Sequence, residues 1–293
     1  MSDNSNYIRR AQEASSQADK LLRPGRFSKM FSSRVGRGIE AAELYKIAAG
    51  CYKIGGDYIS SANEFIKCAE CLPEEAAFYY IDAGNVIKNV NVMDAIKYYN
   101  QAADICLNTP KIDRAASLKR QIAELYEESK EFKLAADSYL QAAELFYSVN
   151  DESSGCSCEL KCAELKILYL NETEDILKAI QIFETVGDKY MSKASHAYSA
   201  RACFFKAALL FLANEDAIGA ENALHRYINS DPEFESKPEY GFVNELIGAI
   251  RGNDLPHFEE LVNKNRRMLD SVASHIILKA KSTITQSEEN QWI

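Results

Sequence analysis

Residues 95–102 read AIKYYNQA, in which Ala95 is followed four places later by Tyr99 and three places after that by Ala102. The same spacing, with a small first residue and a large middle one, recurs four more times along the chain. The other triplets are Ser61-Phe65-Cys68, Ala135-Tyr139-Ala142, Ala179-Phe183-Val186 and Ala220-Leu224-Tyr227. Offsets of four and three place the members of each triplet on one helical face. There the small residues admit a neighbouring helix and the large residue fills the space between helices.

The distance between triplets predicts a repeat architecture. Their middle residues stand 34–44 positions apart, a period typical of stacked helical hairpins in the manner of tetratricopeptide repeats (TPR). The sequence therefore predicts an all-α, TPR-like fold that presents a curved surface to other proteins. A loop is expected at residues 24–38, a turn between hairpins at residues 187–194, and two or more further helices at residues 242–284.

Charge is spread unevenly along the chain. The 293 residues carry a net charge of −9, yet residues 1–38 hold eight basic side chains against three acidic ones. The acidic remainder argues against general nucleic-acid binding. The basic front favours an anionic partner such as a membrane surface. Because no apolar run of 18 residues occurs, any membrane contact is expected to be peripheral.

The motifs of common enzymes and metal sites are missing from the sequence. No P-loop, GxSxG or HExxH string occurs. Cys68 and Cys71 have zinc-like spacing, but no second pair of cysteines or histidines accompanies them. In an intracellular protein, the eight cysteines are typical of reduced core residues. We therefore expect a binding protein with no catalytic residues, no metal and no cofactor.

The front loop, residues 24–38, combines three large apolar side chains with basic ones. Phe27, Met30 and Phe31 stand among Arg23, Arg26, Lys29, Arg34 and Arg37. One interpretation is that the apolar residues fold back onto the first hairpin. The other is an exposed tip that adheres weakly to an anionic membrane, because each buried large side chain contributes about 1.5–3 kcal/mol.

Basic residues also recur within the acidic body of the chain. They are Lys119, Arg120, Lys161, Lys166, Arg201 and Lys206. Such residues usually lie on a solvated helix face. If they line one face of the curve, they would attract an acidic, rod-like partner and set the salt dependence of its binding.

Three segments carry a family resemblance. YSARACFFKAALL (residues 198–210), AFYYIDAGNVIKN (77–89) and AASLKRQIAELYE (115–127) resemble the soluble NSF attachment proteins, alpha type, over essentially the whole chain. The resemblance implies a right-handed solenoid forming a twisted sheet of helices over residues 1–235, with a C-terminal helical bundle and acidic tail over 236–293. It also implies a non-enzymatic cytoplasmic adaptor, peripheral on the cytosolic face of membranes.

The resemblance further implies the partners and the residues that meet them. The protein would be a monomer alone, would coat a SNARE complex in several copies, and would recruit the ATPase NSF to disassemble that complex. Expected membrane contacts are Phe27, Met30 and Phe31. Expected SNARE contacts are Lys119, Arg120, Lys161 and Arg201. Expected NSF contacts are Asp216, Asp254, Glu288, Glu289, Trp292 and Ile293.

The chain departs from the family pattern at several of these places. Ser117 and Ser157 stand where the family has lysines, and Trp292 stands at the position of a family leucine. These departures leave open a divergent alpha-type protein tuned to its own NSF, or a variant that binds SNAREs and couples poorly to NSF. A separate alternative is a generic TPR-type scaffold that binds peptide tails, such as a chaperone co-factor.

Overall fold

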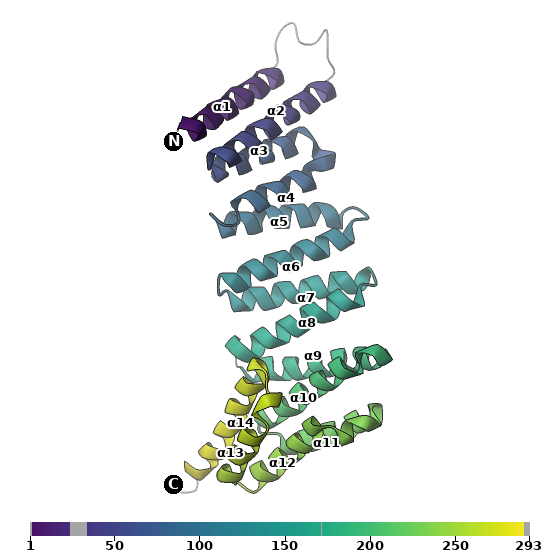
Figure 1. Ribbon diagram of the computed structural model, residues 1–293. Coiled ribbons are helices and arrows are strands. Elements are labelled where there is room, and N and C mark those ends of the chain that lie inside the picture. Colours follow the sequence, from purple (N-terminus) through teal and green to yellow (C-terminus); the bar gives the residue numbers. More distant parts are fainter. Residues whose placement is uncertain (1, 24–33, 171, 290–293) are drawn as a thin grey trace. The chain divides into compact units, whose positions relative to one another are not determined.

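The computed structural model describes residues 2–23, 34–170 and 172–289, and it contains helices and turns but no strand among them (Figure 1). Helices that follow one another run antiparallel, so the predicted all-α fold of helical hairpins is confirmed. The chain divides into two compact units, residues 1–130 with 144–151, and residues 131–143 with 152–293. The division predicted at residue 235 stays a prediction.

The first unit is a row of helices in which each packs on the next in sequence. It holds α1 (Ser2–Leu22), α2 (Arg34–Gly55), α3 (Tyr58–Cys71), α4 (Ala76–Ile87), α5 (Val92–Leu107), α6 (Ile112–Glu128) and the end of α7 (Phe132–Ser148).

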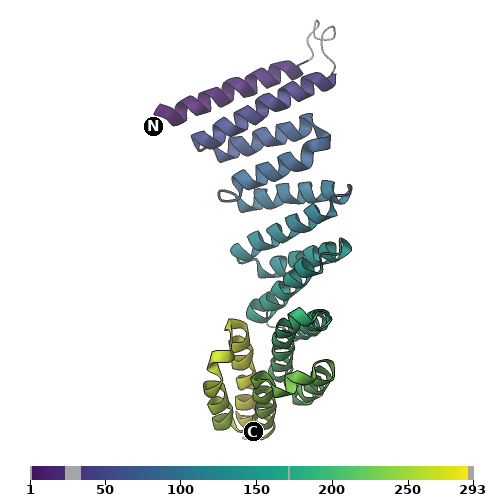
Figure 2. The same cartoon turned by 45° about the vertical axis from the view of Figure 1, so that its right-hand side comes forward.

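The second unit is built around α10, which contacts α9, α11, α12 and α14. After the start of α7 it holds α8 (Glu152–Leu165), a π-helical turn (Lys166–Leu170), α9 (Thr173–Met191), α10 (Ala197–Ala213), α11 (Ala217–Ser230), α12 (Pro238–Arg251), α13 (Leu255–Lys264) and α14 (Ser271–Glu289). Figure 2 shows α12–α14, in yellow-green, gathered beside α10 and α11.

The five triplets lie on every second helix, from α3 to α11, and form the cores of the hairpins. Every member is buried except Phe65, which is half-buried. The prediction that small residues admit a neighbouring helix is confirmed, since the alanines at these positions have no exposed surface. Tyr99 and Phe183 are among the largest fully buried side chains of the described residues.

A glycine opposite Tyr99 shows how closely two of these helices approach. A Cβ atom added to Gly84 on α4 would lie 2.5 Å from Cε1 of Tyr99 on α5. The hydroxyl of Tyr99 also donates a hydrogen bond to Oδ1 of Asn85, at 2.8 Å. The ring is therefore fixed at both its face and its tip, and it has little room to move.

Gly84→Ala is expected to lower the free energy of unfolding by about 1–3 kcal/mol, because overpacking a closed contact costs that amount. Gly50→Ala on α2 is the matched control, since an added Cβ there meets nothing within 4 Å. Alanine is the better helix former by about 0.5–1 kcal/mol, so the control variant should be more stable than the parent. Urea denaturation measures both changes, and a stabilised Gly84 variant would contradict this account.

Two predicted helix boundaries at glycine-containing segments lie elsewhere in the structure. Helix α9 continues through Gly187 to Met191, where a turn was expected to begin at residue 187. A Cβ at Gly187 would lie 2.5 Å from the ring of Phe204, so this glycine permits packing and does not end the helix. Helix α2 likewise begins at Arg34, inside the predicted loop. A Cβ at Gly38 would lie 3.3 Å from the carbonyl oxygen of Cys71.

Candidate partner-binding surfaces

Two of the predicted SNARE-contacting residues lie side by side on α6. Lys119 is half-buried, and its Nζ donates a hydrogen bond to Oδ1 of Asn100, at 2.9 Å. Because the amide is neutral, this contact positions the ammonium group without cancelling its charge. Arg120 lies over the ring of Phe146, at 5.4 Å from the ring centroid, and its Nε lies 3.9 Å from Oε1 of Glu124. The ion pair of Arg120 is exposed and therefore contributes little.

The basic residues of the second unit differ in their surroundings. Lys161 is exposed on α8. Lys166 is buried: its Nζ lies 2.7 Å from Oδ1 of Asp175, and its side chain is 8% exposed. The expectation of a solvated lysine, or one that faces a partner, is therefore wrong for Lys166. A buried ammonium needs a charged partner of its own, and Asp175 supplies it.

Arg201 forms ion pairs within the protein itself. Its guanidinium forms a bidentate pair with Asp231, in which the Nη2–Oδ1 distance is 3.1 Å, and it reaches Oε2 of Glu233 at 2.9 Å. The hydrogen bond from Arg201 holds the pKa of the Asp231 carboxyl below its usual range, against the opposing effect of burial. This pair ties α10 to the turn after α11. A partner's carboxylate would have to share a guanidinium that is already occupied.

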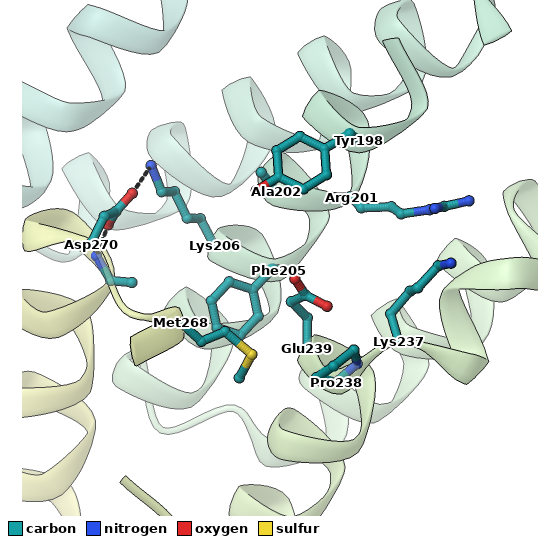
Figure 3. A pocket seen from close by; sticks show the side chains of 11 residues that line it. Tyr198, Arg201, Ala202, Phe205, Lys206, Lys237, Pro238, Glu239, Met268 and Asp270 are labelled. Atoms are coloured by element: carbon teal, nitrogen blue, oxygen red, sulfur yellow. Dashed lines mark hydrogen bonds and ion pairs between the residues drawn. The ribbon is translucent and has the colours of Figure 1, made fainter. Parts of the chain in front are cut away.

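Arg201 also borders a pocket of about 390 Å³ in the second unit (Figure 3). The lining comes from α10, the start of α12, the turn before α14 and the first turn of α14. It consists of Tyr198, Arg201, Ala202, Phe205, Lys206, Lys237, Pro238, Glu239, Met268, Asp270 and Ala273. Lys206 donates to Asp270 at 2.8 Å, while Tyr198 is 80% exposed at the rim. The lining also includes the acidic Glu239 and Asp270, so only Arg201 and Lys237 and the aromatic and apolar side chains could meet an acidic protein segment with apolar contacts.

Arg201 and Lys237 border the same pocket, whose aromatic and apolar residues were not predicted from the sequence. Tyr198 and Phe205 lie on α10, whereas Met268 lies in the turn before α14. Only the tertiary packing of α10 against α12 and α14 brings Met268 to this face of α10, so no local pattern could have identified the pocket.

Two of the four predicted acidic contacts, Asp216 and Asp254, are helix N-caps. Oδ1 of Asp216 accepts a hydrogen bond from the backbone N–H of Gly219 at 2.7 Å, at the start of α11. Oδ1 of Asp254 accepts one from the N–H of His257 at 3.0 Å, at the start of α13. A Cβ at Gly219 would lie 2.1 Å from the Asp216 carboxylate, so a larger residue there would require the carboxylate to shift. Each carboxylate keeps a second oxygen for other contacts.

Two variants of Asp216 are expected to distinguish its role as a helix cap from a role in partner binding. Asp216→Ala should lower the free energy of unfolding by about 1 kcal/mol because it removes the cap. Asp216→Asn keeps a good N-cap and removes only the charge, so its melting temperature should stay close to that of the parent. If both variants lose binding of NSF while only the alanine variant is destabilised, the charge is required for docking. Equal destabilisation of both variants would show that the hydrogen bond depends on the charge.

The remaining predicted contacts fall outside the described part of the structure. They are Phe27, Met30, Phe31, Trp292 and Ile293, together with the side chains of Glu288 and Glu289. Their roles stay predictions.

The cysteines of the CxxC string have structural surroundings. Sγ of Cys68 donates to the carbonyl oxygen of Ala42 at 3.3 Å, and burial raises the pKa of this thiol to about 12. Burial also raises the pKa of Cys71. Within the described residues, no group of three or more His, Cys, Asp or Glu is arranged to hold a metal ion. In the same part of the chain, no helix has the length and apolar character needed to cross a membrane.

Comparison with known proteins identifies the family. The family model described as soluble NSF attachment protein, SNAP, matches residues 9–285. An alpha-soluble NSF attachment protein of Dictyostelium discoideum is 32% identical, covering 96% of this chain and 98% of that protein. One from Vitis vinifera is 27% identical, covering 92% and 97%. The vesicular-fusion protein SEC17 of Komagataella phaffii is 29% identical, covering 95% and 97%. Since both the family model and the Dictyostelium relative span nearly the whole chain, the chain belongs to the soluble NSF attachment protein family.

Proposed function

We propose that this chain is a non-enzymatic adaptor in vesicle fusion, which binds SNARE complexes and recruits the ATPase NSF for their ATP-driven disassembly. The observation that carries the proposal is the match to the family over residues 9–285. The names of its relatives refer to NSF attachment and to vesicular fusion. ATP hydrolysis would belong to NSF, and this chain would supply contacts only.

The SNARE-binding role is supported by basic groups in both units. In the first unit, Lys119 carries a charge that its hydrogen-bond partner, an amide, does not cancel. In the second unit, Lys161 is exposed, and Arg201 and Lys237 border the pocket of Figure 3. A SNARE complex is an acidic helical rod, so such groups would draw it in and set the salt dependence of binding. Alone the chain would be a monomer, with several copies on one complex.

The NSF-binding role is proposed for acidic groups near the C-terminal end. Asp216 and Asp254 are held rigidly by their capping hydrogen bonds, which lowers the entropy lost when a partner binds. Glu288, Glu289, Trp292 and Ile293 are proposed to complete the docking surface. Arg251, close in sequence to Asp254, is paired with Glu221, and this pairing reduces the positive charge that it would present to NSF.

The direct test is disassembly of a SNARE complex by the cognate NSF and ATP, with and without the full chain. We expect disassembly only when the chain is present, and less of it when residues 288–293 are removed. If the folded protein supports no disassembly and instead captures chaperone C-terminal peptides, the function is that of a generic TPR-type scaffold, and the proposal is wrong.

A peripheral position on the cytosolic face of membranes is proposed from the front loop. Phe27→Ser with Phe31→Ser should slow disassembly on liposomes several-fold more than disassembly in solution, because two apolar side chains, each contributing about 1.5–3 kcal/mol when buried, are lost. The measurement compares SNARE complexes that are anchored in liposomes with soluble ones. Equal losses in the two settings would mean that these residues have a structural role.

A further inference from the structure

The turn that joins α13 to α14 concentrates positive charge. Residues 263–267 read NKNRR, and no acidic residue occurs between Leu261 and Leu269. The side chains of Lys264, Arg266 and Arg267 are all exposed. We call residues 263–267 the basic turn. Three cations in four positions are unusual for a chain of net charge −9, and neither the SNARE-binding nor the NSF-binding proposal uses them.

Hydrogen bonds on both sides hold the basic turn in place. Nδ2 of Asn265 donates to the carbonyl oxygen of Leu261 at 2.9 Å, and the N–H of Met268 donates to the carbonyl oxygen of Asn265 at 3.0 Å. On the far side, Asp270 caps α14 by accepting from the N–H of Ala273 at 2.7 Å. The backbone that carries the three cations is therefore fixed before any ligand arrives.

Two of the acidic residues nearest in sequence already have basic partners. Asp270 pairs with Lys206 at 2.8 Å, and Glu259 pairs with Lys281. Within the described part of the chain, no carboxylate lies within 4.0 Å of the charged nitrogens of Lys264, Arg266 or Arg267. The basic turn thus differs from Lys166, Arg201 and Arg226, which have carboxylate partners.

The basic turn also encloses a shallow pocket of about 620 Å³, lined by Asn263, Lys264, Arg266 and Arg267. All four side chains carry hydrogen-bond donors, and no carboxylate or apolar side chain belongs to the lining. A helical protein partner would require apolar contacts at its centre. Guanidinium groups instead match phosphate oxygens, which they bind in bidentate fashion.

We propose that the basic turn binds clustered phosphate groups, such as those of a polyphosphorylated inositol ring. This ring occurs both as a free metabolite and as a lipid headgroup, and the chemistry of recognition is the same in both. The site is distinct from the pocket of Figure 3, because it shares none of the lining residues of that pocket.

Titration calorimetry of the full chain with inositol hexakisphosphate tests the proposal. The variant Lys264→Gln/Arg266→Gln/Arg267→Gln should bind at least about tenfold more weakly, because charge-assisted hydrogen bonds to phosphate are lost. The control Lys88→Gln/Lys97→Gln/Lys133→Gln makes the same change in net charge at exposed positions outside the basic front, and it should bind within about twofold of the parent. Equal weakening in both variants would overturn the proposal.

Further measurements test the chemistry of recognition, the source of the phosphate groups and the folding of the variants. Arg266→Lys/Arg267→Lys keeps the charge but removes the guanidinium forks, so it should weaken binding by about threefold. Vesicles containing phosphatidylinositol bisphosphate should compete with the free ring, whereas vesicles of phosphatidylserine with equal charge should not. Tighter binding of a glutamate-rich peptide than of the ring would indicate a protein partner and overturn the proposal. Circular dichroism melting temperatures within about 2 °C of the parent confirm that the variants fold.

Discussion

Asp175→Ala is expected to lower the free energy of unfolding by about 3–5 kcal/mol. Nζ of Lys166 and Oδ1 of Asp175 lie 2.7 Å apart, and the two side chains are only 8% and 13% exposed. Removing the carboxylate leaves an ammonium group buried without its partner, which is among the most costly single changes in a protein interior. Urea denaturation of the full chain, monitored by circular dichroism, measures the loss.

Two further variants make this prediction specific to the buried pair. Lys166→Met with Asp175→Leu removes both charges and should recover most of the lost stability, because apolar residues of similar size often replace a buried pair at no cost. Glu174→Gln, next to Asp175 but exposed and paired with Lys178, should leave the unfolding midpoint unchanged. A small loss in Asp175→Ala, similar to that of Glu174→Gln, would mean that water reaches Lys166.

The helical hairpins could be predicted from the sequence because their signal is local. A triplet such as Ala95-Tyr99-Ala102 repeats the helical period within eight residues, and the burial of all three follows from that period. The caps at Asp216 and Asp254 are local as well. Each follows a residue in left-handed conformation, Glu215 and Asn253, with φ of 61° and 51°. An aspartate that directly precedes a helix is a known start signal, so capping roles for both could have been predicted.

The surroundings of the basic residues could not be predicted, because they depend on partners distant in sequence. Arg201 meets Asp231 thirty positions later, and nothing near Arg201 in the sequence distinguishes it from the exposed Lys161. Lys166 opens a π-helical turn, in which side chains leave the helix at different angles from those of a continued α-helix. The α-helical period therefore does not apply to it.

Arg201 is paired with carboxylates within the protein, whereas the hydrogen-bond partner of Lys119 is a neutral amide. A large effect on partner binding is therefore expected from substitution of Lys119. Lys119→Glu with Lys161→Glu is expected to weaken binding of a SNARE complex by at least about tenfold, or about 1.4 kcal/mol, and to flatten its dependence on salt. Lys119 loses only a hydrogen bond to a neutral amide, so the loss should concern binding more than folding. Arg201→Glu would be a poor test, because it places a second carboxylate beside that of the buried Asp231. Repulsion between the two negative charges would destabilise the second unit itself.

The matched control for this double variant is Lys20→Glu with Lys178→Glu. It makes the same change in net charge on α1 and α9, at positions that are exposed, and we expect it to weaken binding less than threefold. Binding is measured at two salt concentrations. An electrostatic contact with an acidic rod weakens as the salt concentration rises, whereas a loss of binding caused by unfolding does not show this salt dependence. Equal weakening in both double variants would mean that the SNARE complex responds only to overall charge. Unchanged binding in Lys119→Glu with Lys161→Glu would place the basic contact at other residues, of which Arg201 and Lys237 at the pocket of Figure 3 are the first to examine.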